Sequence, residues 1–438
     1  MVEYSVEHFI FLAKFLEIIK ALGGLIFVAT FFLIIIYIVF ISLGLPDSLL
    51  GVAWPLMHSE YGVSIDAAGL ISMVISGGTI VSSLVSGAIR KRLSTGQITV
   101  ISCFMTAISL LGFSFSPSFI WLIFLAIPLG LGAGAVDAVL NNYVAIHYKA
   151  HHMSWLHCFW GVGATVAPFI MSQFISQQNS WRRGYSTVSI IQFTLFVLLL
   201  FALPLWSKVE RGDQNKAGDL ENDQDQTDII SNPETEKKVN ILKIKGVKLS
   251  LLSFLFYCGV EHTMGLWGSS FLVNFKQLPP YIAAQWVSLY YAGITVGRLI
   301  SGFISLKISN HIMIRLGQIL TLVGAVFLLL PLPNFFSLIG FITVGLGCAP
   351  IFPCMLHETP ARFGKEHSQT IMGYQMALAY SGGTFLPPIL GFIAAHTTIG
   401  IFPFFILSYI IIMLIGSEKI NLLLTNRKTC INTNSENL

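Results

Sequence analysis

A carboxylate occurs where the sequence otherwise predicts a membrane span. Asp47 follows an apolar run that has no charged residue after Lys20. A charge near the bilayer centre costs roughly 2.5–3.5 kcal/mol on insertion scales, so such an acid indicates a functional site. Gly44, Pro46 and Gly51 loosen the helix around it, and free backbone groups at membrane depth are tolerated only against protein or a wet cavity. We therefore expect Asp47 to face a central, water-accessible cavity. The alternative is a carboxylate paired inside the bundle for structure alone.

Asp137 is the second acid in an apolar segment, and small residues precede it from Gly130 onward. Asn141 lies four residues later, so the carboxylate and the amide share one helix face, and Asn142 follows directly. We predict that Asp47 and Asp137 bind the coupling proton and that both amides contact the solute. The alternative is polar contact between closely packed helices.

Several aromatic and polar residues could bind a solute. His157 and Trp160 are three residues apart and can share a helix face. A Trp beside polar groups suits a sugar, which stacks its C–H face on the ring, whereas an interfacial Trp is the alternative. Glu261 and His262 point in different directions on a helix, so at most one faces the cavity. The further candidates are Trp267, Tyr291, Gln375 and Tyr380, and for the last three a contact between helices is the alternative.

Arg298 lies toward one end of a predicted span, in the sequence Gly-Arg-Leu-Ile-Ser-Gly. Its side chain could reach the interface or bind the ends of neighbouring helices. We expect a gating or structural role for it rather than contact with the solute.

The elements that must position these residues are membrane helices. Of the 438 residues, 54% are hydrophobic and only 11% are charged, against about 25% charged in soluble proteins. Spans of about 20 apolar residues each are predicted at 27–57, 65–90, 97–116, 119–147, 152–177, 184–206, 248–275, 281–306, 311–331, 334–357, 366–396 and 400–416. We expect an all-α integral membrane protein of twelve transmembrane helices in two six-helix halves, residues 25–206 and 248–418.

The remaining segments are polar. Residues 1–24 form a predicted N-terminal segment with a possible interfacial helix, residues 207–247 an acidic linker expected to be disordered, and residues 419–438 a tail. With the N-terminus inside, 21 of the 25 Lys and Arg residues fall on the inner side and three on the outer side. The positive-inside rule therefore predicts that both termini and the linker are cytoplasmic.

The two halves repeat at an offset near 215 residues. Gly77 corresponds to Gly293, and other matches follow in the same order; they are Gly130 with Gly345, Gly163 with Gly383, and Gly44 with Gly259. The last match places Glu261 and His262 opposite Pro46 and Asp47. Such parallel halves are related by an axis along the membrane normal and place a substrate site at the midplane between them.

Enzymatic function has little support. His147-x-x-x-His151-His152 resembles one histidine box of membrane di-iron oxygenases, but no second box occurs. The six cysteines show no CxxC or metal-type spacing, and no Gly-rich phosphate loop supports transport driven by ATP. We expect neither an enzyme nor a cofactor or metal site.

These motifs resemble the major facilitator superfamily, and within it the fucose permease-like branch of sugar:proton symporters. The resemblance covers all twelve spans. It is most specific at Ser42-Leu-Gly-Leu-Pro-Asp-Ser-Leu-Leu-Gly-x-x-Trp-Pro, Asn141-Asn-Tyr, His157-Cys-Phe-Trp-Gly-Val-Gly and Gly345-Leu-Gly-x-x-Pro-Ile-Phe-Pro. In fucose permease, acids on the first and fourth spans form the functional pair, and Asp47 and Asp137 occupy those motif positions. The chain departs from that pattern at Asp137, where the family has Glu, at His157, where it has Gln, and after Gly87, where its loop acid is missing.

The resemblance implies proton-coupled uptake of a monosaccharide such as a hexose by alternating access. The alternatives are proton-coupled efflux of a small apolar compound, sodium-coupled sugar transport, and a transporter-shaped sensor, for which the acidic linker offers no output domain. We expect the sugar, protons and the lipid bilayer as partners, no nucleic acid, and a monomer in the inner (cytoplasmic) membrane.

Overall fold

The computed structural model describes residues 32–435 except 149, 179, 224–240 and 306. Within these residues there are no strands, and twelve helices are long and apolar enough to cross a membrane. The first span, Phe32–Tyr61, comprises a helix over residues 32–47 and α2 (Leu49–Tyr61). The others of the first half are α3 (Ala67–Ile89), α4 (Thr95–Phe115), α5 (Phe119–His147), α6 (Ala150–Gln178) and α7 (Trp181–Asp223). The second half holds α8 (Val247–Asn274), α9 (Pro280–Ile304), α10 (Asn310–Leu329), α11 (Asn334–Phe363), α12 (Lys365–His396) and α13 (Phe402–Ser435). The predicted twelve-helix fold is confirmed.

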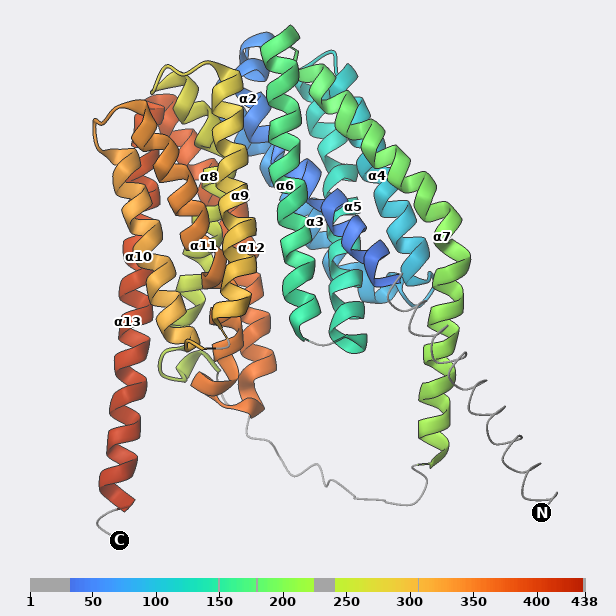
Figure 1. Ribbon diagram of the computed structural model, residues 1–438, viewed down its shortest axis with the longest axis vertical. Helices are drawn as coiled ribbons and strands as arrows, with labels where there is room; N and C mark the ends of the chain where they lie inside the picture. Colours follow the sequence, from blue (N-terminus) through green and yellow to red (C-terminus); the bar gives the residue numbers. More distant parts are fainter. Residues whose placement is uncertain (1–31, 149, 179, 224–240, 306, 436–438) are drawn as a thin grey trace, which may run out of the picture.

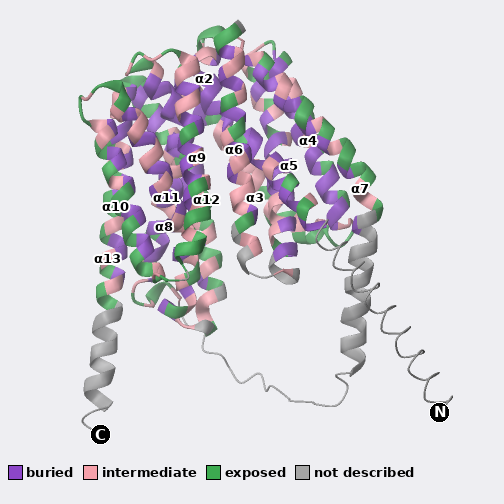
Figure 2. Cartoon of the chain, viewed as in Figure 1, coloured by how far each residue is buried: buried purple, intermediate pink, exposed green. Residues whose placement is uncertain are grey.

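Burial separates central spans from peripheral ones. In an apolar stretch of the first span, Phe32–Tyr61, and of the seventh span, Val247–Asn274, 72% of the residues are buried inside the protein. By contrast, only 28% of the residues are buried in the corresponding parts of α3 and α7, and Figure 2 shows exposed residues along α7 at the edge of the molecule. Large apolar side chains such as Leu84 and Phe201 are exposed there, as expected for helices whose solvent is lipid. The two acids at positions 47 and 261 therefore lie on the two most enclosed spans.

The two halves lie side by side, and both ends of the described chain lie at the same face of the molecule (Figure 1). We call this the terminal face. The halves contact each other mainly through α6 with α9, α3 with α12, and α2 with α8. A site between the halves would therefore lie among these helices and their neighbours.

Glycine packing fixes the register of the internal repeat. A side chain at Gly130 would meet the carbonyl oxygen of Ile75, and one at Gly345 would meet that of Tyr290, so both members of this contact are related by 215 residues. The partner of Gly293 is accordingly residue 78 rather than the predicted Gly77, which has nothing within 4 Å. The adjacent glycines hid this shift of one residue.

A second contact aligns the most enclosed spans. Gly163 packs on the carbonyl oxygen of Ile41, and the same contact in the second half joins Gly382, not the predicted Gly383, to Leu255. Ile41 and Leu255 are 214 residues apart, and this offset relates Asp47 to Glu261. The two acids therefore occupy equivalent positions, whereas the sequence match had placed Glu261 opposite Pro46.

Two helices extend beyond the predicted spans. α7 continues to Asp223 and α13 to Ser435, so the beginning of the predicted disordered linker and most of the predicted tail are helical. Adding a residue to an existing helix avoids the cost of nucleation, and both extensions continue from a span already formed. Residues 1–24 and 224–240 lie outside the described residues.

Candidate functional site

The first span breaks beside Asp47. Pro46 has no N–H, so the Ser42 carbonyl loses its helical donor, and the Gln192 side chain of α7 donates to that carbonyl oxygen at 2.9 Å instead. The helix is interrupted at Ser48, which sits between residues 32–47 and α2. The predicted loosening is thus present, and buried Gln192 is a residue that sequence analysis missed. A lone amide in an apolar span would have been the signal for it.

Asp47 is exposed although it lies midway along one of the two most enclosed spans. Trp160 of α6 donates its indole N–H to Asp47 Oδ2 at 2.8 Å. Among the described residues, no basic side chain lies within ion-pair distance of this carboxylate. Asp47 therefore combines an open approach with a neutral partner, which leaves its charge available to a cation.

Arg298 of α9 connects the two halves at the same level. Its guanidinium lies 3.3 Å from Glu261 Oε1 on α8 of its own half. It also donates to the His157 carbonyl oxygen on α6 at 3.5 Å, and it lies 5.2 Å from the centre of the Trp160 ring. The side chains of Arg298 and Glu261 are only 13% and 12% exposed. The face of Trp160 that was predicted to stack on a sugar holds a cation in this conformation.

Asp137 and Asn141 contact each other as their spacing predicts, with the amide donating to Asp137 Oδ1 at 2.8 Å. The carboxylates of Asp137 and Glu261 are both close enough to Asp47 to act on it electrostatically. Tyr380 of α12 is exposed and within electrostatic range of Asp137. Three carboxylates and one guanidinium thus gather where the helix over residues 32–47 meets α5, α8 and α9.

The remaining predicted binding residues differ in how accessible they are. Asn142 and His262 are exposed, and His262 also bonds the Cys258 carbonyl oxygen of its own helix at 3.0 Å. His157 is half-buried with its ring edge-on to Phe40.

Three others are buried in packing contacts. Trp267 donates to the Pro387 carbonyl oxygen at 2.7 Å, and the Gln375 amide joins Thr359 on α11 to Ser250 on α8. Tyr291 is buried edge-on to Trp160, at 6.3 Å between ring centres. In this conformation Trp267 and Gln375 hold helices together.

Close contacts between the halves lie on the side of Asp47 that faces away from the terminal face. Gly51 of α2 packs directly on the Gly265 backbone of α8, and Gly69 of α3 packs on Pro388 of α12. Along α6 and α9, the Ser288 hydroxyl donates to the Thr165 carbonyl oxygen at 2.7 Å. These backbone-level contacts hold the halves together on that side of Asp47.

On the terminal side of Thr165 and Ser288, Arg298 of α9 contacts the His157 carbonyl oxygen of α6. Nearer the terminal face, Trp155 of α6 and Leu299 and Phe303 of α9 are exposed. Arg298 thus joins α6 and α9 at this level. The gating or structural role expected from its place in the sequence stays a prediction.

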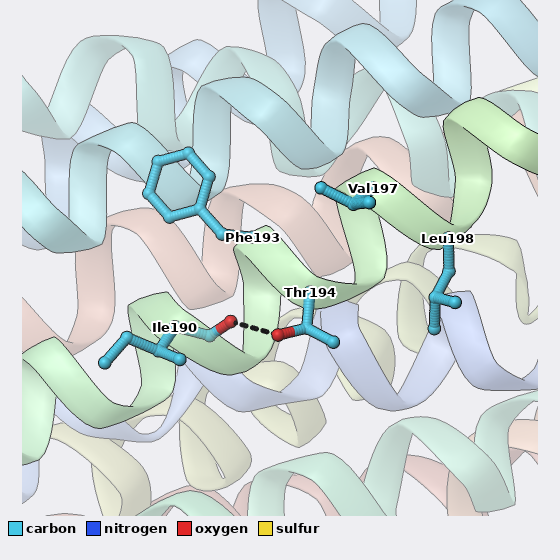
Figure 3. Close-up of a pocket in the computed structure, with 5 residues that line it drawn as sticks. All are labelled: Ile190, Phe193, Thr194, Val197 and Leu198. Carbon is cyan, nitrogen blue, oxygen red and sulfur yellow. Dashed lines mark hydrogen bonds between the residues drawn. The ribbon is translucent and has the colours of Figure 1, made fainter.

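A pocket on α7 is unrelated to this centre. Figure 3 shows it lined by Ile190, Phe193, Thr194, Val197 and Leu198. The lining is apolar, and the one hydroxyl, that of Thr194, donates to the Ile190 carbonyl oxygen of its own helix at 2.9 Å. Lipid chains suit such a surface better than a polar solute does. Within the described part of the chain, no three His, Cys, Asp or Glu side chains are grouped to hold a metal.

The centre thus offers carboxylates, which can bind a cation, together with amide, hydroxyl and indole groups, which can bond a polar solute.

Comparison with known proteins identifies the family of the chain. Residues 36–388 match the Major Facilitator Superfamily. The chain is 24% identical over 385 residues to Bypass of stop codon protein 6 of Saccharomyces cerevisiae, covering 82% of this chain and 76% of that one. It is 23% identical over 367 residues to the glucose/mannose transporter GlcP of Bacillus subtilis, covering 83% and 88%. The crystal structure of a D-xylose-proton symporter has a TM-score of 0.67 at 12% identity, covering 89% of this chain and 96% of that one.

Proposed function

Because the chain belongs to the Major Facilitator Superfamily and is a transporter rather than an enzyme, we propose that it takes up a monosaccharide such as a hexose together with protons. The halves would alternate between a conformation open to one face of the membrane and a conformation open to the other. A solute bound at the level of Asp47 would cross between them without a continuous pore.

One observation carries this proposal. Asp47 lies exposed at the centre of the bundle with an indole, not a base, as its partner. A carboxylate in that place is costly while it is charged, and binding a cation removes the cost. Coupling follows if the loaded carboxylate, but not the bare one, can be enclosed when the halves close over the solute.

The substrate class rests on the polar groups around the acids. Asn141, which contacts Asp137, together with Asn142 and His157 would supply the donors and acceptors that sugar hydroxyls require. Similarity to a glucose/mannose transporter and the motifs shared with the fucose permease-like branch support a hexose. Trp160 would contact the sugar only if Arg298 leaves the face of its ring.

Two alternatives remain candidates by chemistry. Sodium could replace the proton at Asp47 and Asp137, since both ions bind carboxylate oxygens. Efflux of an apolar compound would require few amides near the acids, and the placement of Asn141 beside Asp137 favours a polar solute instead.

The positive-inside rule supports a cytoplasmic terminal face for a protein in the cell membrane. Of the described Lys and Arg residues, Arg90, Lys91 and Arg92 follow α3 at that face, while Arg182 and Arg183 begin α7 at the other.

Uptake by proteoliposomes tests the proposal. Radiolabelled glucose, mannose, fucose and xylose are offered in turn, with a proton gradient, a sodium gradient or neither. We expect one hexose to accumulate under the proton gradient alone. If a sugar accumulates only under the sodium gradient, the coupling ion is sodium and not the proton. If none of the four sugars accumulates but an apolar dye moves under the proton gradient, the substrate is an apolar compound and not a sugar.

A further inference from the structure

Four side chains form a continuous line across the boundary between the halves. Asp47 accepts from the Trp160 indole, the Trp160 ring faces the Arg298 guanidinium, and Arg298 contacts Glu261. The first two residues belong to the first half and the last two to the second half. The outer members of the line are the two acids at equivalent positions of the repeat.

The ion pair at one end of this line is loose. Arg298 and Glu261 make one contact at 3.3 Å, although charge-assisted bonds are usually 2.7–2.9 Å. The other ion pairs between different helices in the described chain are tighter and more exposed. Arg182 contacts Glu60 at 2.7 and 3.0 Å, and Arg315 contacts Glu418 at 2.6 and 2.5 Å. A buried pair with poor geometry adds little stability. Glu261 therefore uses only part of the hydrogen-bonding capacity of the Arg298 guanidinium.

Arg298 also reaches toward the first half, where it meets only neutral groups, a carbonyl oxygen and an aromatic face. The titratable groups that face Asp47 or Arg298 come from every helix packed around them; they are Asp137 on α5, His157 and Cys158 on α6, Tyr257, Cys258 and Glu261 on α8, Tyr290 and Tyr291 on α9, and Cys348 on α11. Arg298 is the one residue of fixed positive charge in this group.

We propose that Arg298 is a positioning residue shared by the two equivalent acids, which offsets the charge of Glu261 directly and sets the charge state of Asp47 through Trp160. This inference rests on the proposed proton coupling and names the group that regulates it. When Asp47 is ionised, its bond to the indole holds the Trp160 ring against the guanidinium. When a proton adds to the exposed Asp47 carboxylate, that charge-assisted bond weakens, and Arg298 then interacts mainly with Glu261.

The link to conformation follows from where Arg298 lies. Its bond to the His157 carbonyl oxygen joins α9 to α6, as does its contact with the Trp160 ring. Release of the Trp160 ring removes one of these two contacts, so loading of Asp47 changes how the two helices are held together. The coupling ion would thereby act on the interface itself.

The test is the pH dependence of glucose counterflow in proteoliposomes, which needs no net proton movement. Arg298→Gln removes the positive charge and leaves Glu261 unneutralised, so the midpoint should move to higher pH by about one unit. Glu261→Gln should move the midpoint to lower pH. Asp47 then loses a neighbouring negative charge, and the positive charge of Arg298 is no longer offset by Glu261. Trp160→Phe keeps the ring but removes the N–H, and should move it upward. Arg298→Lys should restore the midpoint.

A merely structural pair would make Arg298→Gln and Glu261→Gln change the midpoint in the same direction or not at all, and that result would overturn the proposal. A second readout needs no sugar. Spin labels at Trp155→Cys on α6 and Phe303→Cys on α9, both exposed, report the distance between these helices against pH in a background without other cysteines. The pH midpoint of the distance change should also move up in Arg298→Gln and down in Glu261→Gln. If the distances respond in this way while glucose is not transported, the substrate assignment fails and the role of Arg298 stands; if the distances do not respond, that role is wrong.

Discussion

The two halves carry one acid each at equivalent positions but give it different partners. Asp47 is exposed and bound to an uncharged indole, whereas Glu261 is 12% exposed and contacts Arg298. The difference arises at one position of the repeat. The residue equivalent to Arg298 by the offset of 215 is Ser83 on α3, whose hydroxyl donates to the Gly134 carbonyl oxygen at 3.1 Å.

Two equivalent positions of a repeated fold can thus acquire different roles. The repeat places a carboxylate on each central helix, and one arginine then offsets the charge of only one of them. In the proposed mechanism, the first half is left with a carboxylate that gains and loses a cation. The second half supplies a fixed charge that reaches across the boundary. The predictions below test this division of roles.

Ser83→Arg should have the largest effect, because it gives the first half the basic residue that it lacks. A guanidinium at this position would offer Asp47 a permanent counter-ion, so a proton would no longer be needed there. We expect proton-driven accumulation of the sugar in proteoliposomes to be lost. Ser83→Met, of similar length without the charge, is the control and should retain accumulation; loss in both variants would point to crowding instead.

Arg298→Gln should have the next largest effect, this time on stability. Removing one partner leaves the buried Glu261 charge uncompensated, which costs about 3–5 kcal/mol in known buried pairs. The double variant Arg298→Gln/Glu261→Gln should recover most of that loss, as measured by thermal unfolding in detergent. Arg182→Gln provides the matched comparison at the 31% exposed pair with Glu60, and should cost less than Arg298→Gln. Equal losses of stability in Arg298→Gln and Arg182→Gln would mean that burial does not make the central pair more costly to break.

Glycine substitutions should give the smallest effects and sharpen the repeat itself. Gly77→Ala meets nothing within 4 Å and should change stability by less than about 1 kcal/mol, in the stabilising direction. Gly130→Ala and Gly345→Ala should both destabilise, because each new methyl group meets a carbonyl oxygen of the facing helix. Thermal unfolding of the three variants checks this. A tolerated Gly345→Ala beside a damaging Gly130→Ala would mean that the two halves do not pack alike.

Much of this architecture follows from the sequence, because apolar length and the bilayer alone determine where helices must span. The extensions of α7 and α13 could not be predicted from hydropathy, since helix propagation there depends on a span already formed. The acids at 47, 137 and 261 were also predictable, since charge in an apolar segment is conspicuous. Their partners were not, because Trp160 lies 113 residues from Asp47 and Arg298 lies 37 residues from Glu261. Only the packing of the helices brings these groups together.

The central claim is that Asp47 carries the coupled cation, and direct measurement of proton movement tests it. Proteoliposomes containing a pH-sensitive dye receive glucose without an imposed gradient, and the change in internal pH is compared for the wild type, Asp47→Asn and Glu60→Gln. We predict that glucose carries protons inward in the wild type and in Glu60→Gln, while Asp47→Asn exchanges glucose without a pH change. A pH change of wild-type size in Asp47→Asn would contradict the account.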